Sequence, residues 1–224
     1  MTQMQLQATV ENAIRDRAIY YNVSSIYLIS KRLFDIAASF AALVILSPLF
    51  IITAIVVKLN SRGPVFFAQE RNGLRGKIFK MYKFRSMVVN AESLLKQLEG
   101  KNEVKGPMFK IKDDPRITRV GRFIRKTSID ELPQLLNILK GDMSFVGPRP
   151  PIAREVVKYG SWHNLRLSVR PGLTGLWQVS GRNDLGFDEM VNLDLKYIRE
   201  RSFIYDLKII LKTIPVLLGD SKAF

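Results

Sequence analysis

An uncharged run of 22 residues, Ile36 to Val57, limits what this chain can fold into more than any other feature. As a straight helix the run would be roughly 33 Å long, about the thickness of the hydrocarbon core of a bilayer. It starts too late in the chain for a secretory signal, and no cleavage-type motif follows it. A helix that is apolar on every face needs either lipid or a large protein core around it. The alternatives are therefore a buried core helix, a membrane-spanning helix and a helix that enters and leaves the membrane on one side.

The charges that flank this run favour the last alternative. Lys31 and Arg32 precede it, and Lys58 and Arg62 follow it. A spanning helix concentrates its basic residues on the cytoplasmic side, whereas here both ends have the cytoplasmic pattern. The charge distribution therefore predicts that the chain enters and leaves on the cytoplasmic face.

A serine and a proline near the middle of the run predict where the chain turns back. Pro48 removes a backbone donor and clashes with the preceding turn, so it kinks a helix. The Ser47 hydroxyl can bind a carbonyl that the kink frees, which lipid cannot do. We therefore expect a re-entrant membrane helix hairpin at residues 31–58, broken at Ser47-Pro48.

Composition narrows the chemistry that the rest of the chain can perform. The net charge of +15 indicates a polyanionic partner, either nucleic acid, an anionic membrane or a phosphorylated substrate. The absence of cysteine excludes disulfides, thiolate metal sites and a cysteine nucleophile. The single histidine, His163, excludes metal motifs that need two histidines. Catalysis, if there is any, is expected to use carboxylates, lysines and arginines.

The segment after the run predicts a small β-hairpin followed by basic and amphipathic helices. Two β-prone stretches, Val65–Glu70 and Lys77–Arg85, flank a turn that contains Asn72-Gly73. Residues 116–126 carry five basic side chains, and a helix there would place Arg119, Arg122 and Lys126 on one face. Such a face is either solvated or binds phosphates or anionic lipid.

Together these patterns predict a mainly helical α+β fold in a monotopic membrane protein, with interfacial amphipathic helices. Residues 1–30 would form a short N-terminal extension and residues 31–58 the membrane hairpin. Residues 59–224 would form a domain on the cytoplasmic face, and any catalytic residues are expected in it.

The stretch TSIDELPQ, residues 127–134, places two carboxylates side by side after the basic cluster. Ser128 and Glu131 match a capping box, but that register puts Pro133 inside the helix, where it costs stability. A helix capped at Asp130 instead places the proline in the first turn. This register predicts both carboxylates at a helix N-terminus, a position that stabilises anions and also binds phosphate.

Two later segments each present an arginine in a stiff or glycine-rich loop. Arg149 lies between prolines in GPRPP, Gly147 to Pro151, and Arg182 ends the segment RPGLTGLWQVSGR. A loop of this kind is either a polyproline II-like turn or a pre-organised guanidinium for a phosphate.

Several of these segments together resemble one protein family. KRLFD, the run broken at Ser47-Pro48, KFRSM, RKTSIDELPQLLNILKGDMSFVGPRP and RPGLTGLWQVSGRN occur in this order in the bacterial sugar transferases. These are small monotopic phosphoglycosyl transferases that start exopolysaccharide, capsule and O-antigen synthesis. The resemblance covers the chain from about Lys31 to its C-terminus. It implies transfer of a hexose 1-phosphate from a UDP-sugar, with glucose or galactose as the sugar, to undecaprenyl phosphate, with release of UMP.

The resemblance also implies roles for individual residues. Asp130 is similar to the nucleophile that forms a covalent phosphosugar-aspartyl intermediate. Glu131 is similar to the residue that holds a Mg²⁺ ion, the expected cofactor. The positions that match substrate- and phosphate-binding residues of the family are Lys83, Arg125, Arg149 and Arg182.

The expected partners are the UDP-sugar, undecaprenyl phosphate and membrane lipids, with no nucleic acid, at the cytoplasmic face of the bacterial inner membrane. A homodimer or polysaccharide-assembly proteins are the candidate macromolecular partners. Longer family members carry several N-terminal membrane spans and an extra domain, where this chain has a segment of 30 residues.

Two other functions stay open at this point. A metal-dependent glycosyltransferase would release UDP and usually carries an Asp-x-Asp motif, for which this chain has only poor substitutes. A basic membrane or nucleic-acid adaptor could stack bases on Phe79, Tyr82 and Phe84, but the uncharged run argues against it. No residue identifies the sugar.

Overall fold

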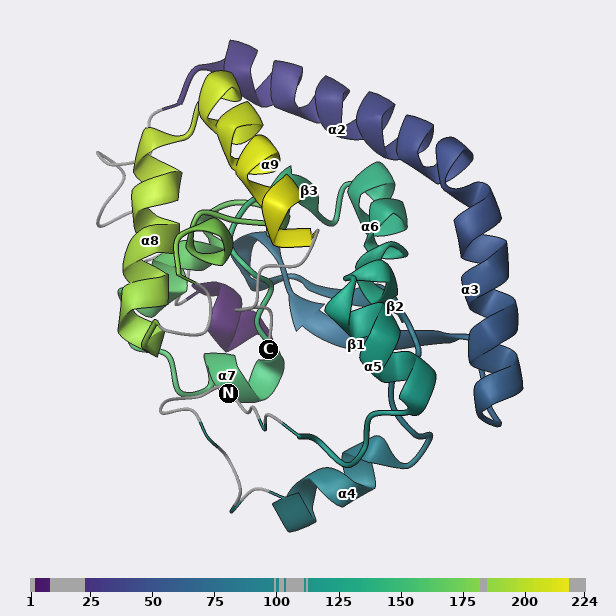
Figure 1. Cartoon of the computed structure of the whole chain (residues 1–224). Coiled ribbons are helices and arrows are strands. Elements are labelled where there is room, and N and C mark those ends of the chain that lie inside the picture. The colour runs from purple at the N-terminus through teal and green to yellow at the C-terminus, as the bar shows by residue number, and fades with distance from the viewer. Residues whose placement is uncertain are drawn as a thin grey trace.

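The computed structural model describes residues 3–8, 23–98, 113–181 and 185–217, together with residues 100, 103 and 111. Its described part is mainly helical, with two small two-stranded sheets (Figure 1). This agrees with the predicted α+β class. The longer elements, in chain order, are α2 (Ser25–Ile45), α3 (Ser47–Asn60), β1 (Phe66–Asn72), β2 (Ile78–Phe84), α4 (Ala91–Leu98), α5 (Arg119–Lys126), α6 (Gln134–Lys140), β3 (Ser144–Val146), α7 (Ala153–Val156), β4 (Gly172–Thr174), α8 (Phe187–Glu200) and α9 (Phe203–Leu217).

Helices α2 and α3 meet at a sharp break in the uncharged run. Their axes are bent by 61°, and Pro48 lies in the first turn of α3. The Ser47 hydroxyl donates a hydrogen bond of 2.8 Å to the carbonyl of Val44. The predicted break at Ser47-Pro48 is therefore confirmed. Among the described helices none is long and apolar enough to cross a membrane alone, whereas α2 and α3 together meet that criterion.

The outer side of this helix pair is apolar and exposed. The pair curves around one side of the body, with α6 and α9 inside the curve (Figure 1). The large apolar side chains that α2 and α3 leave exposed include Ile26, Ile29, Leu33, Phe40, Val44, Ile45, Ile51, Ile52, Ile55, Val56 and Leu59. A contiguous surface of this size is unusual in a soluble monomer and marks an interaction surface.

The inner side of α2 is polar and bonds to three parts of the body. Lys31 pairs with Asp206 of α9 at 2.8 Å. Arg32 donates to the carbonyls of Ile138 and Leu139 at 2.7 and 2.8 Å, near the C-terminal end of α6. The Ile138 carbonyl also accepts from the Gly141 N–H, and the guanidinium adds a positive charge that complements the negative end of the helix dipole.

The third bond from α2 is made by Asp35, which is buried. Its Oδ1 atom accepts from the Ser144 hydroxyl and from the Phe145 N–H, each at 3.1 Å. Asp35 thus binds the start of β3. The apolar helix pair is therefore attached to the body by charged and polar side chains rather than by hydrophobic packing alone.

The first sheet is the predicted hairpin. β1 and β2 pair antiparallel, with Phe66 opposite Phe84 and Asn72 opposite Ile78. Phe84 lies in a buried cluster with Val57 of α3 and Ile124 of α5. The hairpin is therefore fixed between the helix pair and the basic helix.

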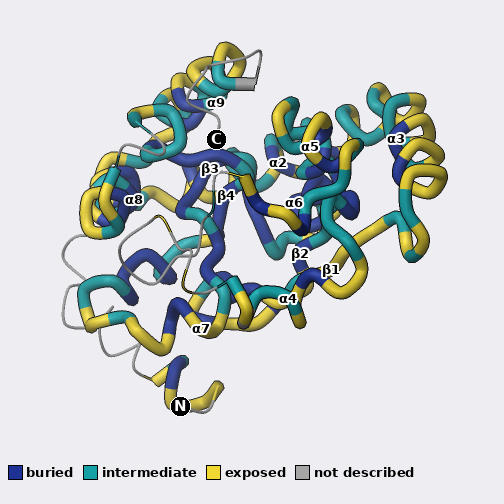
Figure 2. The backbone as a smooth tube through the Cα atoms, turned by 60° about the horizontal axis from the view of Figure 1, so that its bottom comes forward, coloured by how far each residue is buried: buried dark blue, intermediate teal, exposed yellow. Residues whose placement is uncertain are grey.

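The second sheet pairs β3 and β4 in parallel, with Ser144 opposite Gly172. The tube of Figure 2 shows both strands as buried segments in the interior. A Cβ atom on Gly172 would lie 2.1 Å from the backbone nitrogen of Gly147. The glycine at position 172 is thus required because two backbones approach too closely for a side chain.

One side chain, Asn137 of α6, joins the helix to the free edge of β2. Its Oδ1 atom accepts from the Tyr82 N–H at 3.0 Å, and its Nδ2 atom donates to the Lys80 carbonyl at 2.7 Å. These are the two backbone groups that a neighbouring strand would bind. Asn137 is fully buried, so it replaces a third strand at this edge.

We expect Asn137→Leu to lower the free energy of unfolding by about 2–4 kcal/mol, because it removes two hydrogen bonds of a buried amide and leaves a part-buried N–H and a part-buried carbonyl without these partners. The measurement is denaturant unfolding in detergent micelles. Leu136→Ala, which truncates an exposed side chain on the same helix, is the control and should change stability by less than about 1 kcal/mol. Equal effects of the two substitutions would show that the amide bonds contribute nothing specific.

Candidate active site

An ion pair between β2 and the segment before α6 forms the centre of the site. The Lys83 Nζ atom lies 2.5 Å from Oε1 of Glu131. Lys83 is near the end of β2, and Glu131 belongs to a 3₁₀ turn, Ile129–Glu131. Asn137, six residues after Glu131, accepts a hydrogen bond from the N–H of Tyr82, the residue directly before Lys83. This bond holds the two elements together. The pair is therefore positioned by the fold and not only by its own attraction.

Asp130 and Glu131 do not cap a helix, contrary to the prediction from sequence. The α-helix α6 begins only at Gln134, and the two carboxylates precede it in the 3₁₀ turn. Ser128 adopts a left-handed conformation with φ of 54° and makes no capping bond with its side chain. The Glu131 N–H bonds to the Ser128 carbonyl, so the first turn closes more tightly than an α-helix. Pro133, which has no N–H, ends this turn before α6 starts.

The two neighbouring carboxylates lie in different environments. Asp130 is 6% exposed, while the side chain of Glu131 is 34% exposed and paired with Lys83. Successive residues of a 3₁₀ turn point in different directions, so one carboxylate is buried and the other is partly exposed beside Lys83 of β2. The site therefore holds one shielded and one accessible acid.

Burial raises the pKa of Asp130 to about 6. The positive charges of Lys83 and Arg125 oppose this rise, while the neighbouring charge of Glu131 adds to it. A carboxyl group with this pKa is mostly ionised at neutral pH but is more basic than an ordinary aspartate. It can therefore act as a nucleophile or as a base.

Glu131 is shifted in the opposite direction. Burial alone would raise its pKa, but the charge and hydrogen bond of Lys83, followed by the charges of Arg149 and Arg71, lower it below the usual value. Glu131 is thus a stable anion. Adjacent carboxyl groups whose pKa values are driven apart are typical of sites where the two have separate roles.

Arg149 reaches the site from the loop that follows β3. The parallel pairing of β3 with β4 fixes the start of this loop. Its far end is fixed by β1, because the Asn72 N–H donates to the Pro151 carbonyl at 2.9 Å. Arg71 Nη1 donates to the Pro150 carbonyl at 2.8 Å. Prolines supply only carbonyls, so a loop of this composition is held by donors from a neighbouring strand.

Arg125 approaches Asp130 from α5. The helix starts at Arg119 and is capped by Thr118, whose hydroxyl accepts from the Gly121 N–H. Arg116 of the basic cluster is not on this helix, because it is buried and paired with Asp114 at 2.6 Å. The predicted helical face of Arg119, Arg122 and Lys126 is otherwise confirmed, and all three side chains are exposed.

The structure therefore brings together most of the residues that were predicted to form the site. Lys83 lies beside Glu131, and the charges of Arg125 and Arg149 act on Asp130 and Glu131 respectively. Arg182 lies outside the described residues. Ser47 and Pro48 belong to the helix break and not to this cluster.

Sequence reasoning missed two residues that support the site. Arg71 is buried and bound to Gln69 and Pro150, and burial together with the charge of Arg149 lowers its pKa to about 10. Asn137 was the other. A polar residue inside the apolar stretch LLNIL was a visible signal for it, because a buried amide requires partners. Nothing in the sequence around Arg71 distinguishes it from the other basic residues of its hairpin.

A Mg²⁺ ion fits these residues only if the protein and the substrate both supply its ligands. Within the described ranges, no three histidine, aspartate or glutamate side chains gather at one point. Magnesium is commonly held by one or two carboxylates together with substrate phosphates and water. Glu131, which is ionised and partly exposed, has the chemistry of such a ligand.

Comparison with known proteins places this geometry in a family. The family model described as bacterial sugar transferase matches residues 26–220. The chain is 52% identical over 193 residues to the protein named galactosyl transferase CpsE of Streptococcus agalactiae, and the match covers 86% of this chain and 43% of that protein. It is 47% identical over 198 residues to undecaprenyl-phosphate galactose phosphotransferase of Salmonella typhimurium, covering 87% of this chain and 41% of that protein.

A shorter relative is matched over most of its length. The chain is 45% identical over 193 residues to exopolysaccharide production protein ExoY of Sinorhizobium fredii, which covers 84% of this chain and 85% of that protein. The chain thus spans about two fifths of the length of the first two relatives and most of the third. These matches show that the chain belongs to the bacterial sugar transferase family.

Proposed function

We propose that this protein transfers a hexose 1-phosphate from a UDP-sugar to undecaprenyl phosphate and releases UMP. This would be the first membrane step of exopolysaccharide, capsule or O-antigen synthesis. The observation that carries the proposal is the position of Asp130, a buried carboxylate next to the Lys83–Glu131 pair. The name of one relative, undecaprenyl-phosphate galactose phosphotransferase, states this reaction class, and two of the three names refer to galactose.

In the first half-reaction, an Asp130 carboxylate oxygen attacks the sugar-linked phosphorus of the UDP-sugar. The bond between this phosphorus and the bridging oxygen breaks, and UMP leaves with the electron pair. The product is a phosphosugar joined to Asp130 as an acyl phosphate. No proton needs to be removed from the nucleophile, since a carboxylate with a pKa near 6 is already ionised at neutral pH.

In the second half-reaction, a phosphate oxygen of the polyprenyl phosphate attacks the same phosphorus. The bond to Asp130 breaks, the carboxylate is regenerated, and the sugar leaves as a polyprenyl diphosphate derivative. A carboxylate is a good leaving group from phosphorus, so burial that raises the pKa of Asp130 must stop short of making it a poor one. The value of about 6 satisfies both half-reactions.

The cations around the carboxylates make this approach feasible. A carboxylate and a diphosphate repel each other, and phosphoryl transfer depends mainly on positioning and on countercharge. The positive charges of Lys83 and Arg125 act on Asp130, and those of Arg149 and Arg71 act on Glu131. We assign the diphosphate to this group of four. Mg²⁺ held by Glu131 and the diphosphate would supply further neutralisation of phosphate charge.

We also propose that α2 and α3 enter the cytoplasmic leaflet of the bacterial inner membrane as a re-entrant hairpin. The exposed apolar residues of both helices, the bend of 61° and the basic residues at both ends support this arrangement. It would place Asp130 near the membrane surface, where the phosphate of a lipid acceptor is found. Homodimerisation and contacts with polysaccharide-assembly proteins remain expectations from the family resemblance.

We expect Asp130→Asn to reduce UMP release by at least about 10³-fold, because an amide is not a nucleophile towards phosphorus. Purified protein is mixed with UDP-galactose or UDP-glucose and Mg²⁺, without lipid, and the intact mass is measured. Wild type should gain the mass of a hexose phosphate, and the variant should not. Asp188→Asn, at an exposed position, is the control and should form the adduct normally. An adduct on the Asp130→Asn protein, or UDP as the product, would refute the mechanism.

The rate of the first half-reaction should fall as the pH decreases through about 6, where Asp130 becomes protonated. Lys83 favours the ionised form, so Lys83→Met should move this midpoint upward by about one pH unit in addition to lowering the rate. Lys83→Arg keeps the charge and should keep the midpoint. Single-turnover UMP release from pH 5 to 9 provides the measurement. A midpoint that stays in place or falls in Lys83→Met would contradict the role given to Lys83.

The chain contains no cysteine, so single cysteines report topology cleanly. In sealed membrane vesicles of known orientation, Ser25→Cys and Arg62→Cys should react with an impermeant maleimide from the cytoplasmic side only. Ile45→Cys, beside the break, should react only after detergent is added. Labelling of Ser25→Cys from the periplasmic side would show that the helix pair spans the membrane instead.

A further inference from the structure

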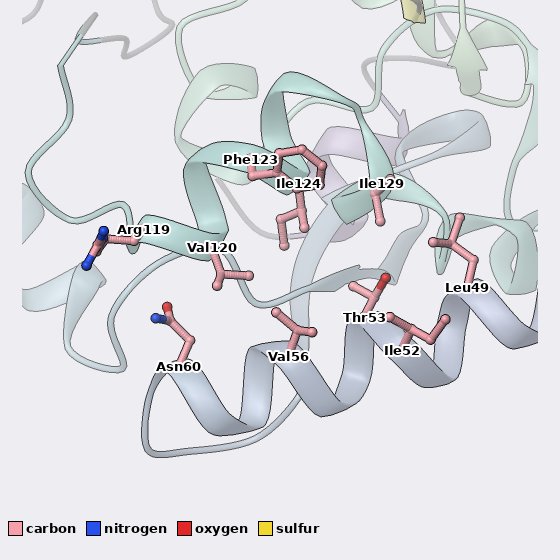
Figure 3. A pocket seen from close by; sticks show the side chains of 10 residues that line it. All are labelled: Leu49, Ile52, Thr53, Val56, Asn60, Arg119, Val120, Phe123, Ile124 and Ile129. Atoms are coloured by element: carbon pink, nitrogen blue, oxygen red, sulfur yellow. The ribbon is translucent and has the colours of Figure 1, made fainter.

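An open groove lies between α3 and α5, on the side of the molecule where the helix pair is apolar (Figure 3). It has a cavity volume of about 440 Å³. Its ten lining residues come mainly from α3 and α5 and include Ile52, Val56, Val120, Phe123, Ile124 and Ile129. The volume lies within the range of small-molecule sites.

The walls of this groove suit a hydrocarbon chain and not a sugar or a nucleotide. Seven of the ten lining side chains are aliphatic or aromatic, and the polar groups Asn60 and Arg119 stand together at one end (Figure 3). A sugar or a nucleotide would need donors and acceptors along its length, because buried polar groups without partners are costly. Ile52, Val56 and Phe123 are exposed on the groove walls, so an apolar occupant would remove them from water.

The opposite end of the groove is lined by the residue that directly precedes Asp130. Ile129 lies there together with Leu49 (Figure 3), and the next residue in the chain is Asp130. Helix α5 contributes Val120 and Ile124 to the wall, and the charge of its Arg125 acts on Asp130. Helix α5 thus presents apolar side chains to the groove and the positive charge of Arg125 to Asp130. This arrangement is complementary to an amphiphile with an anionic head at Asp130 and an apolar chain along the groove.

We infer that the groove between α3 and α5 binds the first isoprene units of the polyprenyl phosphate acceptor. This inference rests on the proposed function, since the acceptor is the substrate that must bring a phosphate to the Asp130 adduct while its chain stays in an apolar medium. The remainder of the chain extends into the lipid beside α3. The groove therefore selects the acceptor and plays no part in the reaction of the UDP-sugar.

The two half-reactions separate this inference from the proposed function. Ile52→Trp fills the groove, and Ile51→Trp places the same side chain at the adjacent exposed position, which does not line it. Formation of the adduct and release of UMP without lipid should be within about twofold of wild type in both variants. With undecaprenyl phosphate as acceptor, Ile52→Trp should raise KM about tenfold or more, and Ile51→Trp should not. Absence of the adduct in wild type would refute the proposed function instead.

Chain length provides a second comparison. Ethyl phosphate carries no isoprene unit and gains nothing from the groove, so wild type should favour undecaprenyl phosphate in kcat/KM. This preference should fall about tenfold in Ile52→Trp and persist in Ile51→Trp. Unchanged KM and preference in Ile52→Trp, or equal changes in both variants, would overturn the inference.

A labelling experiment tests occupancy even if the tryptophan variant misfolds. In detergent micelles, undecaprenyl phosphate should slow maleimide labelling of Ile52→Cys about tenfold or more and leave Ile51→Cys unaffected. Phosphatidylglycerol at the same concentration should not protect. Equal protection by both lipids would show a general lipid groove, and no protection by either would show that the chain binds elsewhere. Either result rejects the inference.

Discussion

The amide of Asn137 holds the strand that carries Lys83 against the helix that follows Glu131, and the geometry of the site depends on this contact. Its two bonds to Tyr82 and Lys80 fix α6 on the edge of β2. Arg32 of α2 holds the other end of the same helix through two carbonyls. Helix α6 has only seven residues, too short to be stable alone, so tertiary bonds must maintain it. The 2.5 Å distance between Lys83 and Glu131 therefore depends on the hydrogen bonds that fix α6 to β2 and α2.

The same hydrogen bonds place the two adjacent acids in different surroundings, so that their pKa values differ. Burial raises the pKa of Asp130, whereas Lys83 and two arginines keep Glu131 ionised. Had both carboxylates been exposed, water would have equalised them, and had both been buried without cations, neither would have stayed charged. The proposed diphosphate substrate would need positive charge in excess at this site. The buried Arg71, bound to the loop that carries Arg149, supplies some of it while stiffening that loop.

The sequence was informative wherever the signal was local. The proline and serine at the helix break, the Asn-Gly turn of the hairpin and the basic helix were all predicted near their observed positions. The start of α6 was not, because Ser128 takes a left-handed conformation that serine rarely adopts and that no capping rule anticipates. Lys83, Arg125 and Arg149 were predicted as site residues through the family resemblance. Their convergence on two carboxylates depends on long-range packing of β2, α5 and the loop after β3, which residue patterns alone do not encode.

The helix pair has two different sides, a polar one that binds the body and an apolar one that is exposed. Lys31, Arg32 and Asp35 recur on the inner side of α2 and bind α9, α6 and β3, while its outer side is exposed and apolar. A membrane anchor joined by a flexible linker would leave the height of the active site above the lipid undefined. Here Arg32, one of the residues that attach α2 to the body, also holds α6, so the position of Asp130 relative to the apolar surface is set by bonds within the fold. Under the proposed function, in which the acceptor would have its phosphate at the membrane surface and its chain in the lipid, this fixed height would be as much a part of the site as the carboxylate itself.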